Sequence, residues 1–280
     1  MGTVYDIFKS SQSKFGSRPF LHVPSVSTQQ YHDGDIDFTY DEAQAEILEL
    51  INQYSEKGYT SGHRVGLLLE NRAEFFFQWL ALNSLGVSIV PLNGDFPENE
   101  LAYVISHSEL DLIISIDEKE DHAAAAVKLT NVDYPIVLVK NITDIPNPLI
   151  AQGRSKPDQN TECAMLYTSG STGQPKGCIL TNEYFTVFGE WYRDLGGMCT
   201  LTPGEERLLT PLPLVHMNAL ACSTMAMLCT GGCIIQLDRF HPSTWWKTVK
   251  DSNATALHYL GVLPAILLNI AETEDEKNHN

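Results

Sequence analysis

One stretch of this chain decides its fold and its chemistry: Leu166-Tyr167-Thr168-Ser169-Gly170-Ser171-Thr172-Gly173-Gln174-Pro175-Lys176-Gly177. It directly follows an apolar segment and brings hydroxyls, glycines and one lysine close together. Glycines let the backbone approach a ligand and adopt positive φ angles. Amides and hydroxyls can donate hydrogen bonds to phosphate oxygens, and Lys176 adds a positive charge. The stretch therefore predicts a loop that binds a polyphosphate.

Two other interpretations of this stretch compete. A Walker A loop has the pattern Gly-x-x-x-x-Gly-Lys-Ser/Thr. Counted from Gly170, Pro175 stands where that pattern has its second glycine, and Gly177 stands where it has the magnesium-binding hydroxyl. A cluster of Ser, Thr and Gly can also be a plain surface linker. The Pro-Lys-Gly end, flanked by apolar segments on both sides, favours the phosphate loop.

Hydrophobic patterning around the stretch alternates between strand-like and helix-like segments. Short apolar runs, of the kind that a parallel sheet buries on both faces, predict strands at 64–69, 87–92, 112–116, 136–139, 164–167, 178–180, 208–210 and 233–237. Apolar residues at helical spacing predict helices that begin after Thr39, at Asn71 as a cap, at Pro97, at Thr181 or Asn182 as a cap, and at Pro242. Thr39 and Glu42 have the spacing of a capping box. The alternation predicts an α/β fold with a largely parallel sheet.

The domain organisation follows from a change in composition. The segment 141–159 is rich in Pro, Asn, Gly and Ser, which predicts a linker between a first α/β part, 1–150, and a second part, 151–280, that carries the phosphate loop. The polar tail 272–280 is predicted to be a surface loop. Trp245 and Trp246 are predicted to pack in the core.

Composition excludes several classes of function. The chain has 280 residues, and 18 basic against 35 acidic residues give a net charge of −17. Such an acidic chain is a poor candidate for binding nucleic acid or an anionic membrane. We expect no signal peptide and no membrane-spanning segment, because the first residues lack the pattern of a signal and no apolar run reaches the length of a span. The six cysteines form no Cys-x-x-Cys pair and lie in apolar segments, so we expect buried free thiols, no zinc site and a cytoplasmic location.

Residues 167–177 resemble the signature Tyr/Phe-Thr-Ser-Gly-Ser/Thr-Thr-Gly-x-Pro-Lys-Gly of the adenylate-forming superfamily, and every fixed place matches. That superfamily includes acyl-CoA synthetases, firefly luciferase and the adenylation domains of peptide synthetases. The likeness covers almost the whole chain, including 38–40, 65–71 and 86–93. His63 and Asn182 depart from the family pattern, and we expect them to affect a turn or a helix cap rather than the chemistry.

The resemblance implies that residues 1–280 form part of the N-terminal large domain of such an enzyme. This domain has sheets flanked by helices and two subdomains, of which 151–280 holds the phosphate loop and the acyl pocket. The family's Tyr-Gly-x-Thr-Glu segment, its ribose-binding Asp and its mobile C-terminal domain with a catalytic Lys do not appear in this sequence. The chain thus resembles about the first half of the enzyme, and we expect this half alone to be inactive.

The resemblance also assigns the residues of the phosphate loop. The residues expected at the pyrophosphate end of ATP are Thr168, Ser169, Gly170, Ser171, Thr172, Gly173 and Lys176. Among them, Lys176 and Thr172 are expected to be catalytic, and Thr168 is expected to contact Mg²⁺.

A second segment, 211–219, contains His216 after two prolines. A lone histidine more often packs at the start of a helix, but the family has a Pro-x-x-His segment at this distance from the loop, and its histidine lines the acyl pocket. The resemblance therefore implies a catalytic and substrate-binding role for His216 and a substrate-binding role for Asn218. The pattern Pro-Leu-x-His-x-Asn-Ala is most similar to the carnitine and crotonobetaine ligase group. Residues 256–264 correspond to the family strand before a Val-Pro turn.

The function implied is that of an ATP-dependent carboxylic acid–CoA ligase, which uses ATP, Mg²⁺ and CoA and has a small-molecule carboxylic acid, whose identity the sequence does not reveal, as its further substrate. Two alternatives stay open. One is a non-catalytic binding or regulatory protein that retains the fold, and the other is an adenylation domain that passes its acyl group to an acceptor other than CoA. A homo-oligomer also stays open.

Overall fold

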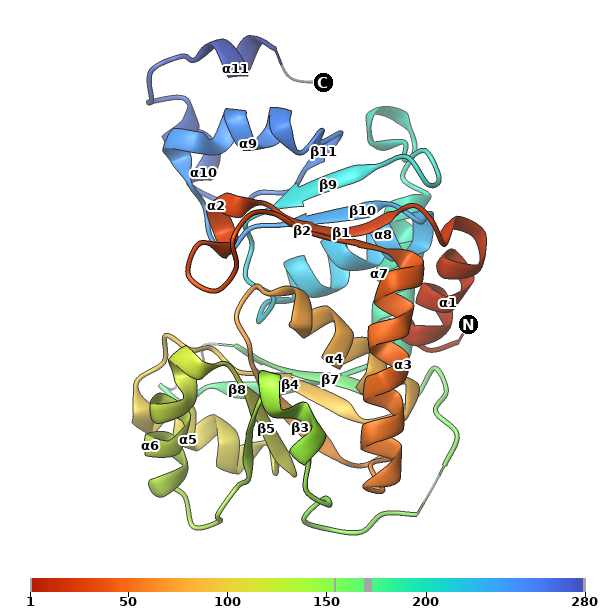
Figure 1. Cartoon of the computed structure of the whole chain (residues 1–280), viewed down its shortest axis with the longest axis vertical. Coiled ribbons are helices and arrows are strands. Elements are labelled where there is room, and N and C mark those ends of the chain that lie inside the picture. Colours follow the sequence, from red (N-terminus) through yellow and green to blue (C-terminus); the bar gives the residue numbers. More distant parts are fainter. Residues whose placement is uncertain (1, 154, 169–172, 279–280) are drawn as a thin grey trace. The chain divides into compact units, whose positions relative to one another are not determined.

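The computed structural model describes residues 2–153, 155–168 and 173–278. The chain forms two compact units, each built around one sheet (Figure 1). The first unit contains Met1–Ile7, Ala45–Glu70 and Glu74–Thr186, and the second contains Phe8–Gln44, Asn71–Ala73 and Val187–Asn280. The predicted α/β fold, with sheets flanked by helices, is confirmed. The units interleave along the chain, whereas the predicted parts 1–150 and 151–280 are sequential, because strands after residue 160 complete the first sheet.

The sheet of the first unit has the strand order β6-β5-β3-β4-β7-β8. Neighbouring strands run parallel from β6 to β7, and β8 then returns antiparallel beside β7. The bounds are β3 Arg64–Leu68, β4 Ser88–Pro91, β5 Leu112–Ser115, β6 Ile136–Leu138, β7 Glu162–Thr168 and β8 Lys176–Thr181. The central strands β3, β4 and β5 are the continuous apolar runs that the sequence indicated, and helices on both faces of the sheet bury them.

Helices α5 (Glu98–His107) and α6 (Glu120–Lys128) cover one face of this sheet. Leu101, Val104 and Ile105 of α5 have helical spacing and join the core beside Val90 of β4. Helix α4 (Ala73–Ser84) lies on the other face (Figure 1). Two short 3₁₀ helices, η1 (Asp117–Lys119) and η2 (Val139–Asp144), adjoin α6 and β6.

The sheet of the second unit has the strand order β11-β9-β10-β1-β2. Neighbouring strands run parallel from β11 to β1, and β2 is antiparallel to β1. The bounds are β1 Pro19–Val23, β2 Ile36–Thr39, β9 Arg207–Thr210, β10 Cys233–Gln236 and β11 Ala256–Leu257. The segment 256–264, expected from the family to lead into a turn, forms only the short strand β11 before helix α10 (Leu263–Leu267).

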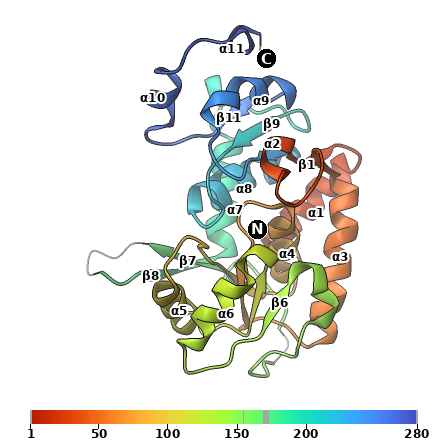
Figure 2. The same ribbon diagram turned by 60° about the vertical axis from the view of Figure 1, so that its left-hand side comes forward.

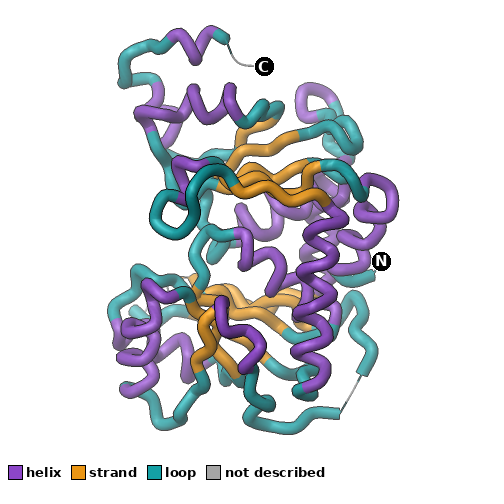
Figure 3. The backbone as a smooth tube through the Cα atoms, in the orientation of Figure 1, coloured by secondary structure: helices purple, strands orange, loops and turns teal. Residues whose placement is uncertain are grey.

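Short helices cover both faces of the second sheet (Figure 3). Their bounds are α2 Ser25–Thr28, η3 Gly197–Cys199, η4 Asn218–Ser223, α8 Thr224–Thr230, η5 Pro242–Thr244, α9 Trp245–Asp251, α10 Leu263–Leu267 and α11 Glu274–Lys277. Trp245 is buried against β9 and β10, and Trp246 packs beside the same core, as predicted. The tail is not entirely loop: α11 forms because the Thr273 hydroxyl accepts a hydrogen bond from the Glu276 amide.

The boundary between the units falls within α1 (Val4–Phe15), α3 (Tyr40–Glu56) and α7 (Asn182–Arg193), and also after the first residue of α4. The predicted capping box of α3 is confirmed. The Thr39 amide donates to the Glu42 carboxylate at 2.8 Å, and the Glu42 amide donates to the Thr39 hydroxyl at 3.2 Å. Within the described ranges, no helix has the length and apolar composition that crossing a membrane requires.

The prediction that all six cysteines are buried is wrong. Their thiols are free, but only Cys163 and Cys233 are fully buried, whereas Cys178 and Cys199 are exposed. Cys178 lies in an apolar segment that turns out to be β8, the edge strand of its sheet. An edge strand has a neighbour on one side only, so its apolar residues are not all covered, and Ile179 beside Cys178 is also exposed.

Candidate functional site

The predicted phosphate loop connects β7 to β8, which form an antiparallel hairpin at the edge of the first sheet (Figure 2). Thr168 ends β7 and Lys176 begins β8, and their Cα atoms are paired across the mouth of the hairpin. Both side chains are exposed. Gly173 has a φ angle of 91°, which favours glycine over residues with a Cβ. Ser169, Gly170, Ser171 and Thr172 lie outside the described residues.

Gly177 allows the two strands of the hairpin to pack closely. A Cβ atom at this position would lie 2.5 Å from Met165 Cε and 3.2 Å from Tyr167 Cζ. Because real Cβ contacts are longer, a larger residue would displace these side chains from β8. The Pro-Lys-Gly end of the motif thus has a structural role besides its charge: its glycine leaves room for side chains of β7.

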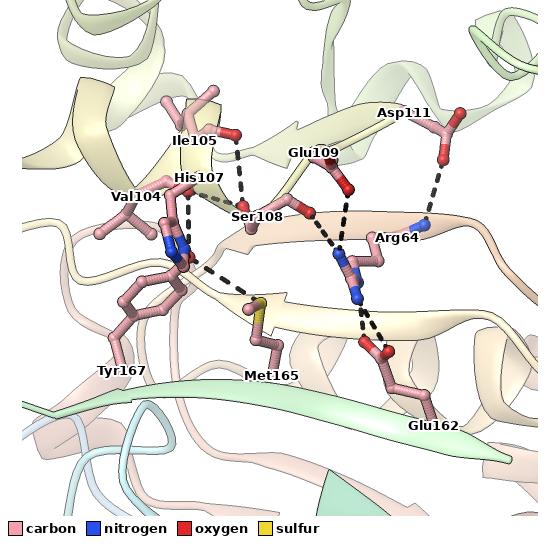
Figure 4. Close-up of polar contacts among 10 residues, drawn as sticks. All are labelled: Arg64, Val104, Ile105, His107, Ser108, Glu109, Asp111, Glu162, Met165 and Tyr167. Carbon is pink, nitrogen blue, oxygen red and sulfur yellow. Dashed lines mark hydrogen bonds and ion pairs between the residues drawn. The ribbon is translucent and has the colours of Figure 1, made fainter. Parts of the chain in front are cut away.

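Tyr167, which directly precedes Thr168, is held by helix α5 (Figure 4). Its hydroxyl lies 2.7 Å from His107 Nδ1, and the His107 ring stacks on Tyr103 with centroids 5.3 Å apart. Burial raises the pKa of Tyr167 to about 12, so the hydroxyl stays protonated at neutral pH and can donate to His107. Successive strand residues face opposite sides of the sheet, so Thr168 points away from this contact.

An ion pair fixes β7 at its other end (Figure 4). The Arg64 guanidinium of β3 donates to both oxygens of Glu162, at 2.8 and 2.9 Å, and to the Ser108 carbonyl at 3.1 Å. The Arg64 amide also donates to Asp111 at 3.1 Å. The hydrogen bonds with Glu162 raise the pKa of Arg64. Bidentate geometry of this kind holds both partners in one orientation, so the strand that leads to the loop is anchored at its start.

The described residues of the hairpin fit a polyphosphate. Lys176 is an exposed ammonium with no ion pair among the described residues, although the chain has a large excess of carboxylates. Thr168 places a hydroxyl opposite it, and a Ser or Thr hydroxyl can bind Mg²⁺ together with phosphate oxygens. A ligand at the mouth of this hairpin would therefore meet the Lys176 ammonium and the Thr168 hydroxyl, which can donate a hydrogen bond or bind a metal ion.

The segment that leads to His216 is held by Asn71. The side-chain amide of Asn71 donates to the carbonyls of Leu212, at 3.1 Å, and Leu237, at 2.8 Å, and its oxygen accepts from the Leu214 amide at 2.9 Å. The prediction that Asn71 caps a helix is therefore wrong, because these three partners use its side chain. Sequence alone could not identify them, since they lie more than a hundred residues away.

His216 itself is exposed, and Asn218 is half-buried at the start of η4. The His216 amide donates to the Pro213 carbonyl at 3.0 Å, which tightens the turn after the proline segment. An exposed imidazole does not agree with a histidine packed at a helix start. The structure brings Thr168, Gly173 and Lys176 together in the first unit, while His216 and Asn218 lie together in the second.

Asn182, one of the two departures from the family pattern, is fully buried and does not cap α7 through its side chain. Its oxygen accepts from the Val4 amide at 3.1 Å and from the Asn83 amide group at 2.8 Å. Its nitrogen donates to the carbonyls of Asp158, at 2.9 Å, and Thr161, at 3.4 Å. A cap formed by the Asn182 side chain is therefore wrong, since all of its hydrogen-bonding capacity joins other segments of the first unit, and the alternative cap at Thr181 stays a prediction.

His63, the other departure, stabilises a turn as expected. Its Nδ1 accepts from the Thr60 amide at 3.0 Å, and its Nε2 donates to the Ile150 carbonyl at 2.7 Å. The histidine is buried, with 1% of its surface exposed.

Sequence reasoning missed one polar cluster in the second unit, formed by Tyr192, Ser223 and His258. These residues are more than thirty positions apart along the chain and match no local motif. The lone His258 in an apolar segment was the available signal.

Comparison with known proteins agrees with the fold and the hairpin motif. A family profile described as AMP-binding enzyme matches residues 8–280. The crotonobetaine/carnitine–CoA ligase of Proteus mirabilis is 22% identical over 259 residues, which cover 86% of this chain and 49% of that protein. The sulfoacetate–CoA ligase of Cupriavidus necator is 28% identical over 221 residues, which cover 77% of this chain and 43% of that protein. The chain spans about half the length of the curated relatives it matches.

Solved structures show the same fold. The N-terminal domain of FACL13 from Mycobacterium tuberculosis aligns with a TM-score of 0.81 at 18% identity, over 100% of this chain and 67% of that one. ATP-bound MatB from Rhodopseudomonas palustris aligns with a TM-score of 0.75 at 22% identity, over 99% of this chain and 53% of that one. The predicted N-terminal large-domain fold of adenylate-forming enzymes is thereby confirmed. Because the family profile covers nearly the whole chain, this protein belongs to the family of AMP-binding enzymes.

Proposed function

We propose that residues 1–280 form the nucleotide-binding part of an ATP-dependent carboxylic acid–CoA ligase. The observation that carries the proposal is the β7–β8 hairpin, in which Thr168 and Lys176 face the same mouth on either side of the signature loop. The names of the relatives, which are CoA ligases for crotonobetaine, carnitine and sulfoacetate, support a small carboxylic acid as substrate. We further propose a cytoplasmic location, where ATP and CoA are available.

The first chemical step joins the acid to ATP. A carboxylate oxygen attacks the α-phosphorus, the bond to the β-phosphate oxygen breaks, and pyrophosphate leaves with the bond's electron pair. A carboxylate is already nucleophilic, so this step needs no general base. Its obstacle is electrostatic, because an anion approaches a polyanion and negative charge grows on the leaving group.

The hairpin supplies groups that offset this charge. We propose that Lys176 and Thr172 stabilise the transition state. The residues that we propose to contact the phosphates of ATP are Thr168, Ser169, Gly170, Ser171, Thr172, Gly173 and Lys176. Preorganised donors stabilise developing charge because they need not reorient during the reaction. Mg²⁺, when bound, would neutralise phosphate charge, and Thr168 is the residue of this chain that we assign to hold it.

The acid is proposed to bind beside His216 and Asn218. In the second step a CoA thiolate attacks the acyl carbon of the acyl-adenylate, a C–S bond forms, and AMP leaves with the electrons of the C–O bond. His216 is exposed and is preceded by a segment that Asn71 immobilises, so it can contact the acid without a change in the sheet.

The experiment that tests the phosphate loop is acid-dependent exchange of pyrophosphate into ATP in the full-length enzyme. Lys176→Ala should lower exchange by about a hundredfold, or on the order of 3 kcal/mol in the transition state, with the melting temperature unchanged. Lys128→Ala is the matched control, because Lys128 is an exposed lysine of the same unit on α6. Equal exchange in the Lys176 variant and the control would refute the assignment.

His216 is tested in the same assay with a panel of acids. His216→Ala should change the KM for the acid, or the rate of thioester formation, more than the KM for ATP. His32→Ala, which alters another exposed histidine of the second unit, serves as control. An effect on ATP with none on the acid would contradict a place in the acyl pocket.

A further inference from the structure

A hydrogen-bonded cluster in the second unit links three segments that are distant in sequence. His258 follows β11, Tyr192 lies in α7, and Ser223 ends η4. His258 Nε2 is hydrogen-bonded to the Tyr192 hydroxyl, and His258 Nδ1 lies 2.7 Å from Ser223 Oγ. The rings of Tyr192 and His258 meet edge to face, with centroids 5.0 Å apart. Ser223 is fully buried.

The direction of these hydrogen bonds follows from the last acceptor in the series, the Asn218 carbonyl oxygen. Ser223 Oγ also lies 3.3 Å from the Asn218 carbonyl, which can only accept. If Ser223 donates to Asn218, then His258 Nδ1 donates to Ser223 and the Tyr192 hydroxyl donates to Nε2. This arrangement gives each of the three hydrogens an acceptor. The reverse arrangement would leave the Asn218 carbonyl without the Ser223 donor.

The imidazole in this arrangement is neutral. Burial lowers the pKa of His258 to about 4, so one nitrogen accepts and the other donates at neutral pH. The cluster is therefore a chain of neutral donors and acceptors that runs from α7 to the Asn218 carbonyl.

That carbonyl belongs to an unusual turn. Residues Asn218–Ser223 form a π-helix, in which the Thr224 amide donates to the Ala219 carbonyl five residues before it. The Thr224 hydroxyl donates to the same carbonyl at 2.9 Å. In the same way, the Ser223 hydroxyl donates to the Asn218 carbonyl, five residues before it. π-Helical turns are rare and occur frequently at functional sites. Here the side chains of Ser223 and Thr224 stabilise the widened backbone.

The turn is continuous with the proposed acid-binding residues. Asn218 is its first residue, and the Leu220 amide donates to the His216 carbonyl at 3.1 Å. Any shift of Ser223 is therefore transmitted to the backbone that carries His216 and Asn218.

We propose that His258 is a positioning residue that holds the π-helical turn through Ser223 and thereby keeps His216 and Asn218 in place for the acid. The Tyr192 hydroxyl fixes the orientation of the His258 imidazole through its hydrogen bond to Nε2. The part that concerns the acid rests on the proposed function above. The part that concerns the turn depends only on the contacts within the second unit.

Residue-resolved hydrogen exchange of the chain tests the turn without any assay of activity. In His258→Phe, which keeps a ring but loses both nitrogens, the amides of residues 219–224 should exchange about tenfold faster. In His258→Asn, the side-chain amide can occupy the place of Nδ1 and donate to Ser223, so most of the protection should return. Unchanged exchange in His258→Phe overturns the proposal, and so does equal loss in the two variants.

Two further variants make the result decisive. His22→Gln is the matched control, because His22 is a buried histidine of the same unit whose Nδ1 bonds to Asp37 at 2.8 Å, and it should leave residues 219–224 unchanged. If His258→Phe does not fold, Ser223→Ala breaks the same link by removing one hydroxyl. Faster exchange of the turn in Ser223→Ala supports the proposal, and unchanged exchange overturns it.

Kinetics of the full-length enzyme test the consequence for the acid. His258→Phe should raise the KM for the acid about tenfold with the KM for ATP unchanged. In His258→Asn, the KM for the acid should lie close to the wild-type value. Equal changes in both constants overturn the positioning role. A wild-type enzyme with no acid-dependent activity would instead refute the proposed function, and the exchange measurement would still decide the role of His258 in the turn.

Discussion

Cysteine residues of this chain differ in the exposure of their side chains. Cys163 lies on β7 in the first unit and Cys233 lies on β10 in the second, and both are buried in the core of their units. Burial raises the pKa of each of these two thiols to about 12. Cys178 and Cys199 are exposed. Since the thiolate is the reactive form, exposure and pKa together determine which thiols an alkylating reagent modifies.

We expect iodoacetamide at pH 8 to modify Cys178 and Cys199 first. Cys163 and Cys233 should react on the order of a thousandfold more slowly in the native chain, because few of their thiols are ionised and the reagent has no access. Peptide mapping by mass spectrometry after timed quenching measures the four rates. In urea all the cysteines should react alike, and native Cys163 reacting as fast as Cys178 would contradict the assigned burial.

At the scale of elements, hydrogen bonds between residues close in sequence could be predicted, whereas hydrogen bonds between distant segments could not. The capping box of Thr39 and Glu42 needs only neighbouring residues, and the structure contains it. Asn71 precedes a helix and Asn182 begins one, but buried carbonyls and amides from remote segments use their side chains instead. The same limit applies to the candidate site: the phosphate motif was visible in the sequence, whereas the Tyr192–His258–Ser223 cluster exists only after folding.

The Asn182 contacts predict a large loss of stability on truncation. Asn182→Ala would leave the Val4 amide without its acceptor and would leave the Asn83 side-chain nitrogen with the Cys163 sulfur as its remaining acceptor among these contacts. Buried groups without partners are destabilising, so we expect the free energy of unfolding to fall by about 2–4 kcal/mol. Urea denaturation measures the change, with Asn147→Ala as the control at an exposed asparagine of the same unit. Equal midpoints for the two variants would show that the Asn182 contacts contribute little.

At the scale of the whole molecule, the proposed chemistry uses residues from both compact units. The β7–β8 hairpin lies in one compact unit, and the proposed acid-binding residues lie in the other. The curated relatives are about twice as long as the chain. Groups that act together in a transition state do not each retain a share of the activity when the others are missing.

Residues 1–280 alone should therefore bind ATP weakly and make no acyl-adenylate. The measurement is mass spectrometry of a mixture of the purified chain, ATP, Mg²⁺ and a panel of small acids. The crotonobetaine/carnitine–CoA ligase of Proteus mirabilis serves as a positive control. Acyl-AMP formed in catalytic amounts by the 280-residue chain would show that it contains a complete active site.

The pairing of β1 with β10 has a consequence for how the protein is made. Leu21 pairs with Ile234, so the second sheet joins two strands that are more than two hundred residues apart along the chain. A ribosome adds about 5–20 residues per second, so on the order of tens of seconds pass between the synthesis of the two strands. During that time the hairpin of β1 and β2 has an unpaired edge, which is the kind of surface that other chains and chaperones bind. The second unit can therefore complete its sheet only after β11 has left the ribosome, whereas the first can form its sheet once residue 181 has left it.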